Sequence, residues 1–230
     1  MRKKVICPII LALLTLSIGT TTNAEVNNIW TSTFSVNRPD GMWLEVFVTV
    51  DATGSVPNSI ERIRIVAPDG NWADTREGAP IYYLPYHKGF DLFVDASGFP
   101  DGIPSGNYRI TVWDNSGSLS VRERVNIRAL PVPTNVYPGP GDTVSTTPTF
   151  SWDPVPGAKR YRLRIGKCWG NECSGYPPWI ELYTNKTSIE IPRWILRPGE
   201  RWLYRLDAYD DYDDYQNKSM TGYISFFTEP

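Results

Sequence analysis

Apolar and polar residues alternate along much of this chain. In residues 42–50 the side chains of Leu44, Val46, Val48 and Val50 fall on one face. The same period of two recurs in four further segments, residues 62–65, 89–95, 108–113 and 119–127. This period is that of a strand with one buried face, and no long stretch shows the 3.6-residue period of an amphipathic helix. Short strands separated by turn formers such as Asn115-Ser116-Gly117 predict an all-β protein of antiparallel sandwiches.

A proline-rich segment predicts where the chain divides. Residues 129–141 contain four prolines and almost no charge. Proline removes backbone donors and favours an extended, stiff path, so a strand of a sheet is not expected here. The sequence therefore predicts two consecutive β-sandwich domains, residues 25–130 and residues 131–230.

The second half carries a recognisable series of strand patterns. Residues 147–152 predict a short strand that ends in the large core residue Trp152, and nine residues after it an inward-facing alternation begins. The apolar positions of the next strands are Tyr161, Leu163 and Ile165, then Ile189 and Ile191, then Trp202, Tyr204, Leu206 and Ala208. Over residues 135–230 these segments resemble a fibronectin type III domain, with strands B, C, E and F in that order. Trp202 stands where the family usually has a tyrosine, and because indole offers only an N–H donor, the family's hydroxyl bond is not expected from this residue.

The first half resembles a generic bacterial immunoglobulin-like sandwich. Its clearest signal is the segment Gly106–Val112, which is followed by an Asp-Asn-Ser-Gly turn. Both resemblances imply modules for adhesion, spacing or scaffolding, and a fold alone does not define a function.

The N-terminus has the order of a secretory signal peptide. Three cations at positions 2–4 precede an apolar run over residues 5–18 and a small-residue site that ends at Ala24. The run is shorter than the roughly 20 residues that span a bilayer. We therefore expect residues 1–24 to be removed and the protein to be periplasmic or secreted by a bacterium. Of the 23 basic residues, which already fall short of the 25 acidic ones, three would be lost in this way. An acidic chain does not favour a nucleic-acid partner.

Two cysteines remain after this processing, Cys168 and Cys173. In an oxidising compartment such a close pair predicts a disulfide bond. The alternatives are free thiols or a metal site, and a metal site would need further ligands of the right type.

The loop tied by these cysteines is the first candidate binding site. It places three aromatic residues together, namely Trp169, Tyr176 and Trp179. Rigid exposed aromatic side chains bury area with little loss of entropy, and sugar rings stack on them. The alternative is that Trp179 packs against the neighbouring sheet and Trp169 covers the loop.

An acidic, tyrosine-rich segment after strand F is the second candidate. Its tyrosines are Tyr209, Tyr212 and Tyr215, and its carboxylates include Asp210, Asp211, Asp213 and Asp214. Clustered carboxylates suit a hard cation, so Ca²⁺ is the one cofactor this sequence suggests, although no glycine supplies the turn of a known calcium loop. A solvated acidic loop, or recognition of a basic or carbohydrate partner through the tyrosines, are the other interpretations.

Charged residues also alternate on two neighbouring strands. Arg160, Arg162 and Arg164 fall on the outward face of strand C, and strand F offers Arg205 and Asp207. With Glu181 nearby, cross-strand ion pairing is the plain interpretation. The alternative interpretation, which is more specific, is that these arginines form a basic stripe that binds a ligand.

No constellation of residues indicates catalysis. The only histidine is His87, and no serine lies in a nucleophile-elbow motif that it could serve. We expect a non-catalytic, exported binding or scaffold protein of the cell envelope or exterior, which contacts a protein or polysaccharide through its sandwich loops. A carbohydrate-binding accessory module and a two-domain periplasmic chaperone are the alternatives.

Overall fold

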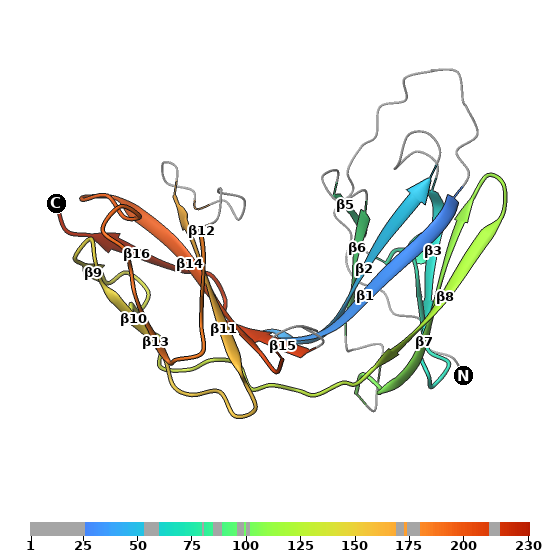
Figure 1. Ribbon diagram of the computed structural model, residues 1–230, viewed down its shortest axis with the longest axis horizontal. Helices are drawn as coiled ribbons and strands as arrows, with labels where there is room; N and C mark the ends of the chain where they lie inside the picture. Colours follow the sequence, from blue (N-terminus) through green and yellow to red (C-terminus); the bar gives the residue numbers. More distant parts are fainter. Residues whose placement is uncertain are drawn as a thin grey trace, which may run out of the picture. The chain divides into compact units, whose positions relative to one another are not determined.

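The computed structural model describes residues 26–52, 60–79, 81–84, 89–95, 99, 102–168, 173, 180–211 and 217–230. These residues form β-strands (Figure 1), which are joined by turns and by one 3-10 turn, η1 (Thr75–Glu77). The predicted all-β sandwich class is thereby confirmed. The predicted signal peptide, residues 1–24, lies outside the described residues.

Contacts within the chain define two compact units. The first contains the described residues up to Ser35 together with Met42–Ile127. The second contains Arg128–Pro230 and also the short segment Val36–Gly41, which comes from the hairpin between the first two strands.

The first unit is a sandwich of two sheets. One has the order β1 (Val26–Arg38), β2 (Gly41–Ala52), β6 (Gly89–Asp95) and β5 (Ile81–Leu84). The other has the order β4 (Trp72–Asp74), β3 (Ile60–Val66), β7 (Gly106–Asp114) and β8 (Ser118–Val125). The apolar face predicted for residues 42–50 is buried, and it packs in one core with Ile63 and Ile65 of the second sheet. Burying apolar surface stabilises such a pair of sheets by about 25 cal/mol for each Å² removed from water.

Asp114 organises the turn that follows β7. Its Oδ1 accepts hydrogen bonds of 2.8 Å from the backbone N–H groups of Ser116 and Gly117 and from the Ser116 hydroxyl. Its Oδ2 accepts one of 2.6 Å from the N–H of Val26, at the start of β1. Burial by itself would raise the pKa of Asp114, but these donors outweigh it and lower the pKa. The turn predicted from Asn115-Ser116-Gly117 is confirmed.

The second unit has a fibronectin type III-like arrangement. Its larger sheet has the order β12 (Ile180–Thr184), β11 (Arg160–Lys167) and β14 (Arg201–Tyr209), with β15 (Asn217–Met220) and β16 (Ile224–Thr228) both beside β14. Strand β9 (Thr143–Val144) runs parallel to β16, and β10 (Thr149–Ser151) pairs with β13 (Ser188–Glu190) in a second sheet. Strands predicted as B, C, E and F correspond to β10, β11, β13 and β14. The narrower resemblance of the first unit to bacterial immunoglobulin-like domains stays a prediction.

Aromatic rings fill the core of the second unit. Phe150, Tyr204 and Phe226 make three edge-to-face contacts with centroids 4.9–5.9 Å apart. Trp152 is buried as predicted. Trp202 is also buried, and its indole N–H has no hydrogen-bond partner among the described residues. Two residues later the Tyr204 hydroxyl donates a hydrogen bond to the carbonyl of Pro138, which lies in the segment that enters the second unit and not in the turn before β14.

The segment Val36–Gly41 completes an edge of this second unit. Strand β1, whose last residues belong to it, is the neighbour of β15 in the sheet order. The side chain of Asn37 donates a 2.8 Å hydrogen bond to the carbonyl of Leu130, which is buried in the core of the second unit. The side of the sheet formed by β15 is therefore covered by a hairpin from far upstream in the chain.

Candidate interaction surfaces

A buried carboxylate lies at the centre of the charged cluster on β11 and β14. Asp207 is fully buried and stands opposite Arg162 in the strand register. The Arg162 guanidinium donates to it at 2.6 and 3.0 Å, and the Arg205 guanidinium donates at 2.7 and 3.1 Å. Burial alone would raise the pKa of Asp207, but the positive charges of Arg205 and Arg162 outweigh this and bring the pKa to about 2. The carboxylate therefore stays ionised and bound to both arginines.

The same cluster extends to the edge strand β12. Nε of Arg164 lies 2.8 Å from Glu181, and the Arg162 guanidinium lies 3.6 Å from it. The Tyr183 hydroxyl donates to the other oxygen of Glu181 at 2.9 Å. Arg160 lies over the ring of Tyr183, 4.3 Å from its centroid. The predicted cross-strand ion pairing is confirmed, and because these groups are engaged with one another, we assign the cluster to the fold rather than to a ligand.

A second cluster of this kind lies on the first unit. Asp74 is buried and accepts hydrogen bonds from the Arg62 guanidinium, while Arg64 lies 3.9 Å from it. Each arginine also covers a tryptophan ring at 4.6 Å, Arg62 over Trp113 and Arg64 over Trp72. Burial alone would raise the pKa of Asp74, but the hydrogen bond from Arg62 and further donors lower it. Such guanidinium–ring contacts stabilise by about 0.5–2 kcal/mol each.

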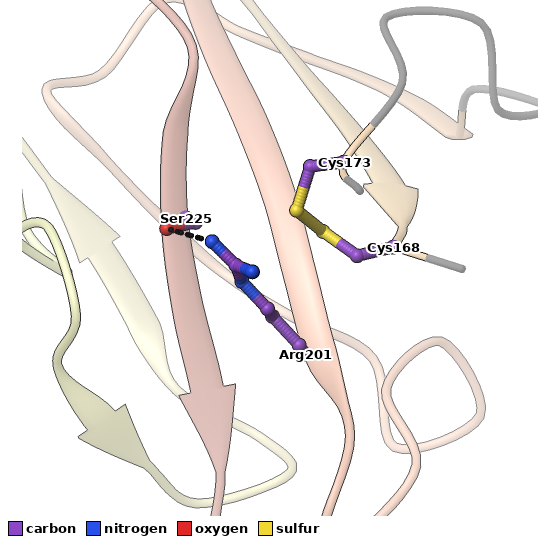
Figure 2. The surroundings of a disulfide bond; sticks show 4 residues. All are labelled: Cys168, Cys173, Arg201 and Ser225. Atoms are coloured by element: carbon purple, nitrogen blue, oxygen red, sulfur yellow. Dashed lines mark hydrogen bonds between the residues drawn. A yellow bond between two sulfur atoms is a disulfide. The ribbon is translucent and has the colours of Figure 1, made fainter. Parts of the chain in front are cut away.

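The predicted disulfide is present. Cys168 follows the end of β11 and is bonded to Cys173, five residues later (Figure 2). The N–H of Cys168 donates a 3.0 Å hydrogen bond to the carbonyl of Arg201 at the start of β14, which fixes one end of the tied loop to the sheet. Figure 2 also shows the side chain of Arg201 directed toward Ser225 of β16. The aromatic residues assigned to this loop, Trp169, Tyr176 and Trp179, lie outside the described residues.

The acidic segment begins inside the sheet rather than in a loop. Tyr209 is the last residue of β14, only 2% exposed, and its hydroxyl donates to Asp207 at 3.2 Å. Its ring is therefore not available to a partner. Asp210 is also buried, and its two oxygens accept hydrogen bonds from the backbone and side-chain amides of Asn217 at 3.3 and 2.7 Å. These bonds close the base of the loop.

Of the rest of the acidic segment, the structure describes Asp211. Asp211 is half-buried, and its carboxylate lies 3.8 Å from the ammonium group of Lys159. In the part of the chain that is described, no three carboxylate, histidine or cysteine side chains converge as metal ligands would. Tyr212, Tyr215, Asp213 and Asp214 lie outside that part, as does His87, so calcium binding stays a prediction.

One surface residue that the alternation pattern did not indicate is Trp194. It lies in the turn between β13 and β14 and is 76% exposed, the highest value among the large hydrophobic side chains described. Its two successors, Ile195 and Leu196, are buried in the core of the second unit. The turn is closed by a 3.0 Å hydrogen bond from the N–H of Ile195 to the carbonyl of Pro192. The tryptophan is thus presented to solvent by a turn that the core holds in place.

Comparison with known proteins finds distant similarities among solved structures. No family model and no curated protein matches the chain. Among solved structures, it is similar to the FN1–FN3 domains of chicken CNTN1, with 12% sequence identity and a TM-score of 0.32. The match covers 90% of this chain and 64% of that one, so it spans less than two thirds of the chicken fragment. Within the described ranges, no helix has the length and apolar character needed to cross a membrane.

Proposed function

We propose that this chain is an exported, non-catalytic binding protein of the cell envelope or exterior, and that it contacts a protein or polysaccharide through the Trp194 turn. The observation that supports this most directly is the exposure of Trp194 on an anchored turn. A large apolar side chain that is exposed in this way does not contribute the roughly 1.5–3 kcal/mol of folding free energy that its burial would give. Tryptophan in a preorganised position is also the residue type that most often dominates binding energy.

The surroundings of Trp194 fit a contact surface. Arg193 and Arg197, on either side of it, are exposed. The carbonyl of Arg197 accepts a 2.5 Å hydrogen bond from the Thr228 hydroxyl, so the end of the turn is tied to β16. A central aromatic anchor with charged residues around it is the usual anatomy of a binding site. Little entropy is lost on binding when the turn is already ordered.

The test compares two exposed tryptophans, one inside the proposed contact surface and one outside it. Trp194→Ala and Trp30→Ala remove the same side chain, and Trp30 is 53% exposed on strand β1 of the first unit. The mature wild-type chain and both variants are exposed to a glycan array and to crosslinking with envelope proteins of the source organism. We expect the specific partner of the wild type to be lost with Trp194→Ala and kept with Trp30→Ala. A partner lost equally with both variants, or with neither, would contradict the proposal.

The same experiment separates the two partner classes. Retention on the array would favour a carbohydrate-binding module, because a sugar ring stacks on an exposed indole and its hydroxyls hydrogen-bond to arginine. Crosslinking without retention on the array would favour a protein partner.

A further inference from the structure

Three exposed arginines lie together on the outer face of β7 and β8 in the first unit. Arg109 on β7 stands directly opposite Arg122 on β8. In the adjacent row of the same face, Asn107 stands opposite Arg124. We call Arg109, Arg122 and Arg124 the arginine face. Side chains two residues apart along a strand are roughly 6.6–6.8 Å apart and those across a pair are about 5 Å apart, so three positive charges are held close together.

The arginine face differs from every other arginine cluster described above. Arg62 and Arg162 are each bonded to a buried aspartate. By contrast, across the described part of the chain none of the three guanidinium groups of the arginine face makes an ion pair or a side-chain hydrogen bond. Like charges directly opposite one another destabilise a sheet. Folding of the sandwich therefore gives no reason for this arrangement.

Protection of a sheet edge explains only part of the arginine face. Strand β8 lies at the end of its sheet, and charged side chains on such a strand discourage pairing with other chains. This reason applies to Arg122 and Arg124. It does not apply to Arg109, because β7 is paired on both sides, with β3 and with β8.

Hydroxyl groups continue the surface along the same two strands. Thr111 and Ser120 are opposite one another in the next row, with their hydroxyl oxygens 2.8 Å apart, and Ser118 follows in the row beyond. Ser118 and Ser120 are exposed. The surface therefore offers planar cationic groups beside groups that both donate and accept hydrogen bonds.

We propose that the arginine face binds an anionic polysaccharide that carries carboxylate or sulfate groups. Guanidinium pairs with these planar or tetrahedral anions through two parallel N–H donors, which lysine cannot do. The serine hydroxyls of β8 then hydrogen-bond to sugar hydroxyls. This goes beyond the proposed function, since it adds a second surface on the other unit and states the chemistry of its ligand.

Other polyanions fit this surface less well. Single-stranded nucleic acid needs open aromatic faces for base stacking, but the rings of Trp113 and Trp72 are each covered by a guanidinium. A protein surface that binds a membrane presents exposed apolar side chains to the lipid. Among the described residues, no large exposed hydrophobic side chain lies on β3, β7 or β8.

The experiment measures retention of the mature chain on immobilised polygalacturonate and heparin, with neutral dextran as the baseline. The variant R109Q/R122Q/R124Q removes the arginine face. The control R76Q/K159Q/K186Q removes three exposed positive charges that lie outside both proposed surfaces. We expect the first variant to lose about tenfold or more in affinity, which corresponds to about 1.4 kcal/mol, and the control to lose less than about twofold. We also expect the melting temperature of the first variant to be unchanged or higher, because opposed like charges are removed.

Several results would overturn the proposal. They are the absence of wild-type retention on both polysaccharides, an equal loss with the two triple variants, and tighter binding of an oligodeoxynucleotide or of phosphatidylglycerol vesicles through the same arginines. If the triple variant does not fold, the affinities of Arg122→Gln and Arg122→Lys are compared with that of the wild type instead. The lysine variant keeps the charge without the paired donors and is expected to bind between wild type and Arg122→Gln. Because Trp194→Ala leaves this surface intact, polysaccharide retention that survives Trp194→Ala separates the two proposals.

Discussion

The buried hydroxyl of Tyr204 donates a 2.5 Å hydrogen bond to the carbonyl of Pro138, 66 residues earlier in the chain. This bond joins the middle of β14 to the segment that enters the second unit. In the first unit, Tyr108 makes a similar 2.6 Å bond to the carbonyl of Pro104. Burial raises the pKa of both phenols. Each sandwich thus uses a core tyrosine to hold a proline-containing segment against its sheet.

Tyr204→Phe is expected to destabilise the second unit by about 1–3 kcal/mol, because the Pro138 carbonyl is left without its donor in a buried site. Urea unfolding followed by tryptophan fluorescence measures this change. Tyr137→Phe is the control, since Tyr137 is exposed and the change is expected to stay below about 0.5 kcal/mol. Equal effects of the two substitutions would show that the buried bond contributes nothing.

Stability is expected to fall in acid through Asp207. Its folded pKa of about 2 lies below the unfolded value of about 3.9, so the contribution is fully present above about pH 4 and is lost as the pH falls toward 2. The size of this contribution is about 2–3 kcal/mol. Unfolding free energies of wild type and Asp207→Asn, measured from pH 7 to pH 2, test it. The gap between the two proteins should narrow by that amount below pH 4, and a gap independent of pH would contradict the prediction.

At neutral pH, Asp207→Asn is expected to cost about 3–5 kcal/mol, because it leaves Arg162 and Arg205 without their shared carboxylate. The exposed pair Arg76–Glu61 provides a contrast. Glu61→Gln is expected to cost less than about 1 kcal/mol, since exposed ion pairs contribute little. Chemical unfolding of both variants at one pH measures the difference.

Loss of the disulfide is expected to have a small effect. The closed loop is short, so replacing both Cys168 and Cys173 by serine should cost about 2 kcal/mol or less. The backbone bond from Cys168 to Arg201 does not depend on the sulfur atoms and should persist. Thermal unfolding of wild type with and without reductant, beside the double variant, measures the cost. Complete unfolding of the second unit on reduction would contradict this expectation.

Trp194→Ala is expected to change the free energy of unfolding by less than about 0.5 kcal/mol, because little area is buried there. Trp152→Ala removes the same side chain from the core and is expected to cost about 3–5 kcal/mol. Measured together, the two variants separate a surface contact residue from a packing residue. A large cost at Trp194 would mean that it supports the fold.

Strand periodicity was sufficient to predict the sandwich and much of its core. The alternation in β2 and β11 identifies residues such as Val46, Val48, Leu163 and Ile165, all of which are buried, because a pleated strand places every second side chain on one face. The pairing of Cys168 with Cys173 followed from their spacing. Cross-strand charges on β11, β14 and β12 also paired as predicted, since neighbouring strands bring outward positions together.

The candidate site was harder to predict, because the exposure of a side chain depends on which other elements pack beside it. The alternation of residues along one strand does not specify those elements. Tyr209 was assigned to a loop, yet β14 continues to it and the side chains of Arg162 and Asp207 surround it. Trp194 lies in a turn without any period, and only the burial of Ile195 and Leu196 decides that it points outward. That Arg109 faces another arginine, and no acidic partner among the described residues, required the strand register, which a single sequence does not give.

The membership of residues 36–41 in the second unit means that the polypeptide passes between the two units three times rather than once. Cleavage in the proline-rich segment near residue 131 would therefore leave two fragments that still associate, because the hairpin remains inserted beside β15. Conversely, a fragment that starts at Arg128 would expose the backbone of β15 along one side. Such a fragment is expected to self-associate or to recruit a foreign strand.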